Sequence, residues 1–175
     1  MRYPVPGRGR ADLATRLRVV EDAYSDAQHD LDVVLTRPTL FDASDPATAD
    51  FLRTLRTCQR LPRERGALLM SWTADEAIAA LETAWRRARA SGEQVGLSRL
   101  RPVERSRVRR ARRLLRKAAS DRGSVPLRHG YFRRAENLLS GLVVLPDALR
   151  AEILEAVHRP SRLEGPVADA GSTWV

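Results

Sequence analysis

Hydrophobic residues recur at intervals of three and four positions along most of this chain, which is the spacing of an amphipathic α-helix. The most regular run comprises Leu13, Leu17, Val20, Tyr24, Ala27, Leu31 and Val34. These residues fall on one side of a single predicted helix, and we call them the N-terminal seam. We expect this helix to end before Pro38, because the residue that precedes a proline disfavours the α conformation.

Capping residues bound the next two predicted helices. One begins at "SDP" (44–46), where the Ser or the Asp can accept hydrogen bonds from unpaired backbone N–H groups and the Pro suits the first turn. Its inner face comprises Phe51, Leu55 and Cys58. The next helix begins at Thr73, which has capping-box spacing to Glu76, and is expected to stop at Gly92. Its inner face comprises Ala77, Leu81, Trp85 and Ala88.

The second half of the chain predicts three more helices. A strongly basic helix runs from Pro102 to near Gly123, and the last helix is closed by Pro160. The inner faces expected for the two helices that follow the basic one are Leu127, Tyr131, Ala135, Leu138 and Leu142, and then Leu149, Ile153 and Val157. Residues 161–175 are rich in Pro, Gly and Ser and lack periodicity. The predicted fold class is therefore all-α, a single-domain bundle of five or six helices over residues 1–160 with a disordered C-terminal tail.

The net charge of +9 is concentrated in one segment. Residues 99–122 carry 11 basic and 2 acidic side chains, whereas residues 1–98 carry 14 of each kind and residues 123–175 carry 6 of each kind. Such a local excess attracts nucleic acid, anionic lipid or an acidic protein. The basic helix is therefore the surface on which we expect a partner.

This basic helix has two faces. Its apolar residues occupy an arc of about 140°, which is an ordinary core-facing stripe: Val108, Ala111, Leu114, Leu115, Ala118 and Ala119. The remaining arc carries the candidate nucleic-acid-binding residues Arg105, Arg109, Arg110, Arg113, Arg116 and Lys117. Several of these cations stand four residues apart, and each such pair costs about 0.2 to 0.5 kcal/mol. A solvated face would normally mix charges of both signs, so the alternatives are a face bound by a polyanion and a face that is solvated or paired within the chain.

Two neutralising partners fit the basic face. Nucleic-acid phosphates would be bound through the backbone with little sequence specificity, because residues 99–122 contain no aromatic side chain on which bases could stack. The alternative is the acidic outer face of the first helix, which could balance about half of the excess: Glu21, Asp22, Asp26, Asp30 and Asp32. The protein would then be a helical scaffold whose N-terminal seam engages another protein or a second copy. Reversing the charge of Arg109 and Arg113 would weaken nucleic-acid binding in the first case and destabilise the fold in the second.

The sequence predicts no catalytic site, cofactor or metal ion. Asp26 with His29 and Glu155 with His158 have the carboxylate-x-x-His spacing found in ferritin-like metal helices. However, His29 lies opposite the N-terminal seam and is expected to face water, whereas a metal ligand would have to face the bundle interior. The glycines at 7–10 lack the flanking strand and Lys-Ser/Thr of a phosphate-binding loop. We therefore expect a protein that is not an enzyme.

Residues 63–100 resemble the ANTAR family of RNA-binding antiterminator domains over about a fifth of the chain. The positions that carry the resemblance are Gly66, Leu69, Met70, Thr73, Asp75, Glu76, Ala77 and Leu81. The resemblance implies RNA binding. The link between Met70 and Thr73 is shorter than that family requires, and an ordinary capped helix start also yields "TADEA". We therefore assign no family from it.

The expected cellular compartment and the C-terminal tail add little to the functional interpretation. The N-terminus lacks an apolar stretch of signal-peptide length, and the longest strongly apolar run, "LVVL" (142–145), is far too short to cross a membrane. The single cysteine suits a reducing compartment. We expect a cytoplasmic protein without a membrane partner. The final Thr173, Trp174 and Val175 match the pattern that PDZ-type grooves capture, but so short a match often arises by chance.

Overall fold

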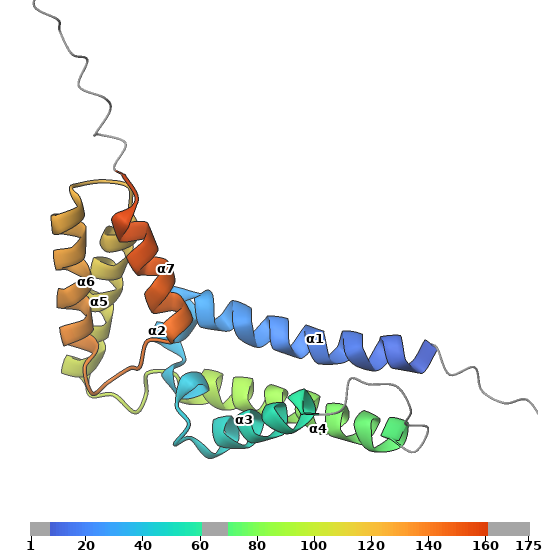
Figure 1. Ribbon diagram of the computed structural model, residues 1–175. Helices are drawn as coiled ribbons and strands as arrows, with labels where there is room; N and C mark the ends of the chain where they lie inside the picture. The colour runs from blue at the N-terminus through green and yellow to red at the C-terminus, as the bar shows by residue number, and fades with distance from the viewer. Residues whose placement is uncertain (1–7, 61–69, 161–175) are drawn as a thin grey trace, which may run out of the picture.

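The computed structural model describes residues 8–60 and 70–160, which form seven α-helices and one short 3-10 helix, with no strand among them (Figure 1). In chain order they are α1 (Arg8–His29), α2 (Leu31–Thr36), η1 (Pro38–Phe41), α3 (Pro46–Gln59), α4 (Met70–Val95), α5 (Pro102–Ala119), α6 (Val125–Leu139) and α7 (Asp147–His158). The all-α prediction is confirmed, with one α-helix more than the expected range. The predicted tail at 161–175, including its last three residues, lies outside the described part of the chain.

The extra helix arises at Asp30, in the middle of the helix predicted from Leu13 to Val34. The backbone of Asp30 is extended, and its carboxylate accepts hydrogen bonds from the N–H groups of Asp32 (2.8 Å) and Val33 (3.1 Å). These donors would otherwise be unpaired at the start of a helix. Asp30 therefore caps α2, and the prediction of one continuous helix is wrong at this residue.

The described helices pack around two hydrophobic cores. The first lies between α1, η1, α3 and α4, where the rings of Tyr24, Phe51 and Trp85 meet with centroids 4.9 to 5.8 Å apart. The second lies between α2, α5, α6 and α7. The half-buried Phe41 packs against both cores. Figure 1 shows α5, α6 and α7 standing together at one end, with α1, α3 and α4 extending away from them.

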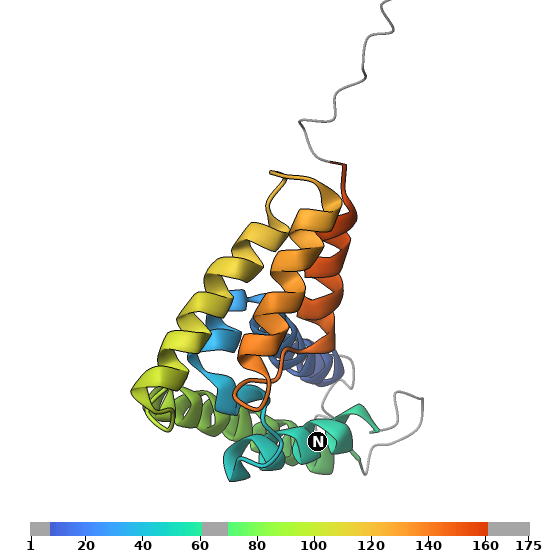
Figure 2. The ribbon, with the colours of Figure 1, turned by 90° about the vertical axis from the view of Figure 1, so that its left-hand side faces the viewer.

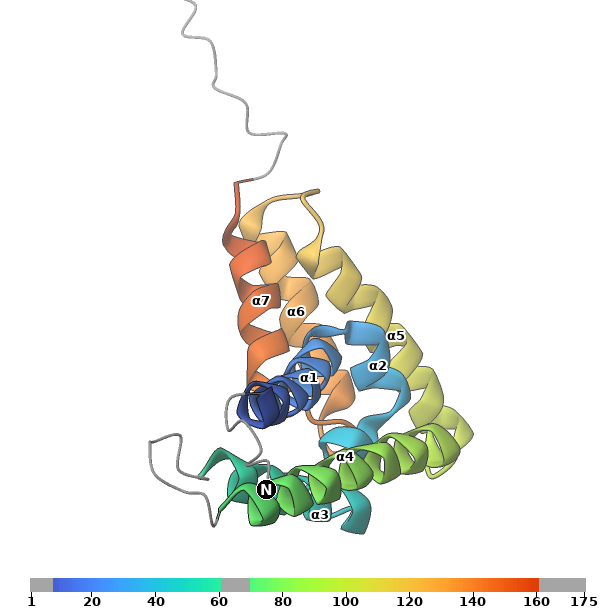
Figure 3. The same cartoon turned by 90° about the vertical axis from the view of Figure 1, so that its right-hand side faces the viewer.

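The N-terminal seam contributes to both cores. Its residues from Leu13 to Ala27 pack in the first core, whereas Leu31 and Val34 pack in the second. The break at Asp30 redirects the chain between them, and Figure 3 shows α2 beside α5 while α1 lies over α4. The seam therefore packs inside this chain, and a partner that used the same seam would have to displace it.

The N-terminus of α3 and the bounds of α4 test the capping predictions. Asp45 caps α3 by accepting from the N–H groups of Ala47 and Thr48, as expected. The predicted bounds of α4 are wrong at both ends, because the helix begins at Met70, before the expected cap at Thr73, and continues past Gly92 to Val95. Gly96 follows with φ of +46°, the left-handed conformation that ends helices. Gly92 is instead buried inside α4, where an added Cβ would lie 3.4 Å from that of Leu40.

The buried face of α6 is rotated from the predicted one: Ala135 is buried as predicted, but the other buried positions each follow a predicted position by one residue, and Leu142 lies beyond the end of the helix. The buried residues are Arg128, Phe132, Ala135 and Leu139. Leu127, expected inside, is 48% exposed, and Tyr131 and Leu138 are only partly buried. By contrast, the predicted inner face of α7 is confirmed, since Leu149, Ile153 and Val157 are all buried.

Arg128 is the charged residue that this rotation places in the core, where its exposed fraction is 0%. Its Nη1 donates hydrogen bonds to the carbonyls of Ser120 (3.2 Å) and Ala156 (3.0 Å), and its Nη2 donates to the carbonyl of Arg159. These acceptors lie at the C-terminal ends of α5 and α7, where unpaired carbonyls carry the negative end of each helix dipole. A buried cation from α6 therefore caps two neighbouring helices at once.

Candidate nucleic-acid interface

Helix α5 carries the basic surface and is anchored by a narrow apolar stripe. It begins at Pro102, as predicted, and Glu104 accepts a hydrogen bond from the N–H of Arg101 at 2.8 Å. The buried residues are Val108, Ala111, Leu115 and Ala118. Leu114 is only partly buried and Ala119 is exposed, so the stripe is narrower than predicted. The helix ends at Ala119, four residues before Gly123.

Three of the predicted residues form one row along α5. Arg105, Arg109 and Arg113 are spaced four residues apart, so neighbouring Cα atoms are about 6 Å apart along the axis; we call them the outer row. Arg109 and Arg113 are exposed and Arg105 is partly buried. Among the described residues, none of the three takes part in an ion pair. The outer row is therefore a set of uncompensated cations one helical turn apart.

The adjacent flank of α5 is paired with α2. Asp32 forms two ion pairs: its Oδ2 lies 2.6 Å from Nη2 of Arg112 and 2.9 Å from Nη2 of Arg116. The hydrogen bond from Arg112, together with the charges of both arginines, lowers the pKa of the Asp32 carboxyl below its usual value. The basic helix therefore does pair with an acidic residue of the predicted first helix, but with Asp32 alone among the five acids expected there. It uses Arg116 and also Arg112, which was not among the predicted binding residues.

The other acids expected to cover the basic helix have different roles or partners. Glu21 accepts a hydrogen bond from the side chain of Gln59, and Asp30 caps α2. Asp22 and Asp26 are exposed on α1 and form no ion pair with a described residue. The acidic face of α1 therefore leaves the outer row unpaired.

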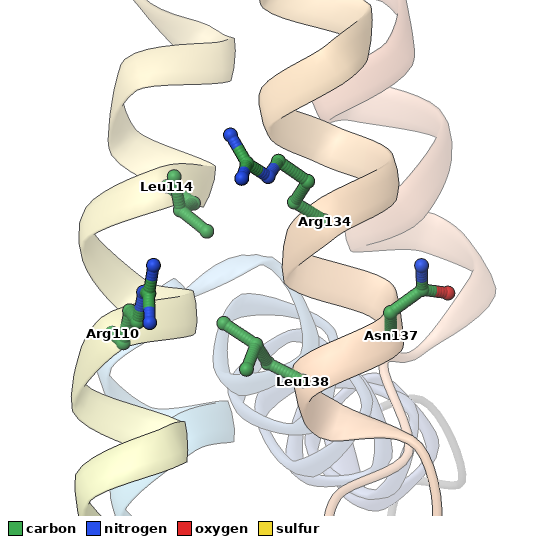
Figure 4. Close-up of a pocket in the computed structure, with 5 residues that line it drawn as sticks. All are labelled: Arg110, Leu114, Arg134, Asn137 and Leu138. Atoms are coloured by element: carbon green, nitrogen blue, oxygen red, sulfur yellow. The ribbon is translucent and has the colours of Figure 1, made fainter.

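The opposite flank of α5 faces α6. The Nζ of Lys117 lies 5.6 Å from the ring centroid of Tyr131, within cation–π range. Arg110 lines a pocket of about 310 Å³ whose other lining residues are Leu114, Arg134, Asn137 and Leu138 (Figure 4). The six predicted residues thus divide among the outer row, the Asp32 pair and this flank.

Arg134 is a cation of this surface that sequence reasoning missed. It is exposed on α6, and Figure 4 shows its guanidinium reaching across towards Leu114 of α5. It was missed because the 99–122 segment was treated as the whole basic surface, whereas the short connection after Ser120 places α6 alongside α5 (Figure 2). The pair "RR" at 133–134 was the available signal.

Acidic residues on α5 and α6 are few and already paired. Glu104 is bound by the Arg101 side chain, which lowers the pKa of Glu104. Glu136 pairs with Arg150 of α7 at 2.8 Å, on the side of α6 that faces α7. No other acid occurs in either helix. The field over their outer surface is therefore positive, which favours a polyanion.

The histidines and the cysteine behave as surface and core residues. His29 and His158 are exposed, and their Nδ1 atoms lie 2.8 and 2.7 Å from backbone carbonyls one turn earlier. Cys58 is 1% exposed in the first core, where burial raises the pKa of its thiol. Across residues 8–60 and 70–160, no group of three potential metal ligands comes together, and no helix combines the length and apolar character needed to cross a membrane.

Comparison with known proteins gives no independent indication of the function. None of the family models, curated proteins or solved structures compared with this chain matches it. The resemblance of residues 63–100 to the ANTAR family is thus not supported by a family model, and residues 63–69 lie outside the described part of the chain. The function has to be inferred from the surface itself.

Proposed function

We propose that this protein is a non-enzymatic accessory or regulatory protein that binds the phosphate backbone of nucleic acid through α5. The observation that supports the proposal is the outer row of Arg105, Arg109 and Arg113, which forms no ion pair with any acidic side chain that the structure describes. Holding like charges one turn apart costs stability unless a partner neutralises them. Phosphates do so, and they release counterions as they bind.

The dimensions of the outer row suit a phosphate backbone. From Arg105 to Arg113 it extends roughly 12 Å at the α-helical rise, and that length of duplex axis carries about seven phosphate charges. The duplex therefore carries more phosphate charges over this length than the outer row has arginines. Arg110 adds a fourth cation beside the row. No exposed aromatic side chain lies on α5, so binding rests on charge and discriminates little between sequences.

The alternative, an internally paired basic helix, has a specific observation behind it as well. Asp32 neutralises Arg112 and Arg116 and joins α5 to α2. That contact includes no residue of the outer row, since Asp32 pairs with Arg112 and Arg116 alone among the described arginines. We therefore assign Arg112 and Arg116 to fold stability and Arg105, Arg109 and Arg113 to binding.

A pair of charge-reversed variants tests this assignment. We expect Arg109→Glu with Arg113→Glu to weaken binding of a labelled mixed-sequence duplex by about tenfold or more, measured by fluorescence anisotropy at low salt. The matched control is Arg18→Glu with Arg87→Glu, two exposed arginines on α1 and α4 that form no ion pair with described residues. Both double variants change the net charge equally, so an equal loss in the control would refute a role for the outer row.

A further inference from the structure

The pocket between α5 and α6 has an apolar floor and a basic rim. Figure 4 shows Leu114 and Leu138 pointing into the space between the two helices, while Asn137 projects away from it on the α6 side. Arg110 and Arg134 complete the lining. We call this feature the α5–α6 groove. Its volume of about 310 Å³ accommodates a few anchoring side chains and lies at the small end of the range for small-molecule sites.

Helical spacing continues the two sides of the groove beyond the pocket as two regular stripes. On α5 the stripe consists of Val103, Arg107, Arg110, Leu114 and Lys117, and on α6 it consists of Leu127, Tyr131, Arg134 and Leu138. Both stripes alternate spacings of four and three, the pattern by which helices present one seam to another helix. Val103 is 72% exposed and Leu127 is 48% exposed, so the seam is open at both ends.

The charge of the groove is entirely positive. Arg107 donates to the carbonyl of Asn137 and Lys117 lies over Tyr131, which ties the two helices together at separate points. Arg110 and Arg134, between these points, form no ion pair with a described residue. The only acids on the two helices, Glu104 and Glu136, are bound to Arg101 and Arg150. An occupant would therefore have to bring its own negative charge.

We propose that the α5–α6 groove docks an acidic amphipathic helix of a partner protein. A helix laid along two helices inserts apolar side chains at i, i+3, i+4 and i+7 into the line between them. Leu114 and Leu138 would receive those anchors, and Arg110 and Arg134 would pair with carboxylates flanking them. A phosphate backbone gains nothing from a recessed leucine floor, and the one nearby ring, Tyr131, is partly buried with Lys117 over it, so the groove suits a peptide better than a nucleic acid.

The test uses the full-length chain and a defined probe. The probe is a helix-forming peptide with leucine at i, i+3, i+4 and i+7 and glutamate on the flanks, and a scrambled peptide of the same composition is its control. A fluorophore on Asn137→Cys, at the edge of the groove, reports a partner that covers it, and the labelling is selective because the only native cysteine, Cys58, is buried. A label on Ala79→Cys of α4, also exposed, is the matched reference. We expect the amphipathic peptide to change the signal at 137 and to leave the signal at 79 unchanged.

Two neighbouring charge reversals then locate the contact. Arg134→Glu is expected to reduce the affinity for the amphipathic peptide by about tenfold, which is the loss of roughly 1.4 kcal/mol. Arg133→Glu, also exposed, unpaired with any described acid and not part of the groove, is expected to change the affinity by less than about twofold. Arg109→Glu with Arg113→Glu should also leave peptide affinity nearly unchanged, so failure here is distinguishable from failure of nucleic-acid binding.

Several results would overturn the proposal. Equal binding of the scrambled peptide would mean that charge alone attracts the probe and that the leucine floor is not used. Equal effects of Arg133→Glu and Arg134→Glu would place the peptide elsewhere. A signal change at 137 that is produced by duplex in place of peptide, or by raising the protein concentration with no peptide present, would identify nucleic acid or a second copy as the occupant.

Discussion

At the scale of single residues, Arg128 shows most clearly how a side chain determines the arrangement of its neighbours. It contributes the only guanidinium with an exposed fraction of 0% among the described residues, and it binds carbonyl groups instead of a carboxylate. The ends of α5 and α7 therefore meet at a side chain of α6. Because α5 carries the outer row, Arg128 helps to fix the direction in which that row faces.

Replacing Arg128 with methionine keeps much of its length but removes all its donors. We expect Arg128→Met to lower the free energy of unfolding by about 3 kcal/mol, since three carbonyls at helix ends lose the buried guanidinium that binds them. Urea denaturation followed by circular dichroism measures the change. Arg133→Met, on the exposed side of the same helix, should stay within about 0.5 kcal/mol of wild type; a similar loss in both variants would contradict the capping role.

Asp32 gives a prediction with a defined pH dependence. Its pKa in the folded protein lies below the usual 3.8, so its stabilising effect is complete above about pH 4 and disappears as the pH falls through the lowered pKa. The side chain is 45% exposed, which limits the effect to less than about 1 kcal/mol. Asp32→Asn should therefore be less stable than wild type at pH 6 and nearly equal to it at pH 2. Denaturation at the two pH values tests this, with the exposed Asp22→Asn as a control that should show no difference at either.

Sequence reasoning located the residues of α5 but not the roles of Arg128, Arg134 and Asp30. In α6 the stripe of Leu127, Tyr131 and Leu138 contains as many apolar residues as the buried face, because it borders the α5–α6 groove. A count of hydrophobic positions cannot distinguish a half-open groove from a core. It also assigns an arginine to the surface unless the helix ends that it caps are already known.

At the scale of elements, the helix starts marked by proline were predictable, whereas the start of α4 and the helix ends were less so. Pro46 and Pro102 open α3 and α5 as expected, because proline needs no hydrogen-bond partner in the first turn. The junction at Asp30 was missed because the N-terminal seam keeps its spacing across it. Its residues on either side face different cores, and only the three-dimensional arrangement of α2 reveals the change.

The end of α4 offers a direct comparison of two glycines. Gly96 has a positive φ, so Gly96→Ala should cost about 1 kcal/mol of stability. Gly92 is helical, and a Cβ there would make ordinary contacts with Leu40 and Arg37, so Gly92→Ala should cost nothing and could gain from the better helix propensity of alanine. Thermal denaturation of the two variants ranks them. A larger loss at Gly92 would show that close packing against η1 requires the glycine.

At the scale of the whole molecule, the two cores differ in the charge of the helices around them. The first core is surrounded by helices of mixed charge, including the pair formed by Arg16 and Glu82 between α1 and α4. The second core supports α5 and α6, whose outer surface is almost free of acids. The composition of residues 99–122 predicted this excess, and it did so without structural information. Which cations remain unpaired depended on the position of Asp32, which only the fold supplies.

The salt dependence of duplex binding tests the central claim most directly. If four unpaired arginines of α5 each neutralise one phosphate, log K plotted against log salt concentration should have a slope of about −3 to −4. Arg109→Ala with Arg113→Ala should reduce the magnitude of the slope by about 2, whereas Arg18→Ala with Arg87→Ala should leave it unchanged. The same slope for wild type and the Arg109/Arg113 variant, or no binding of duplex at low salt, would contradict the assignment of α5 as a phosphate-binding helix.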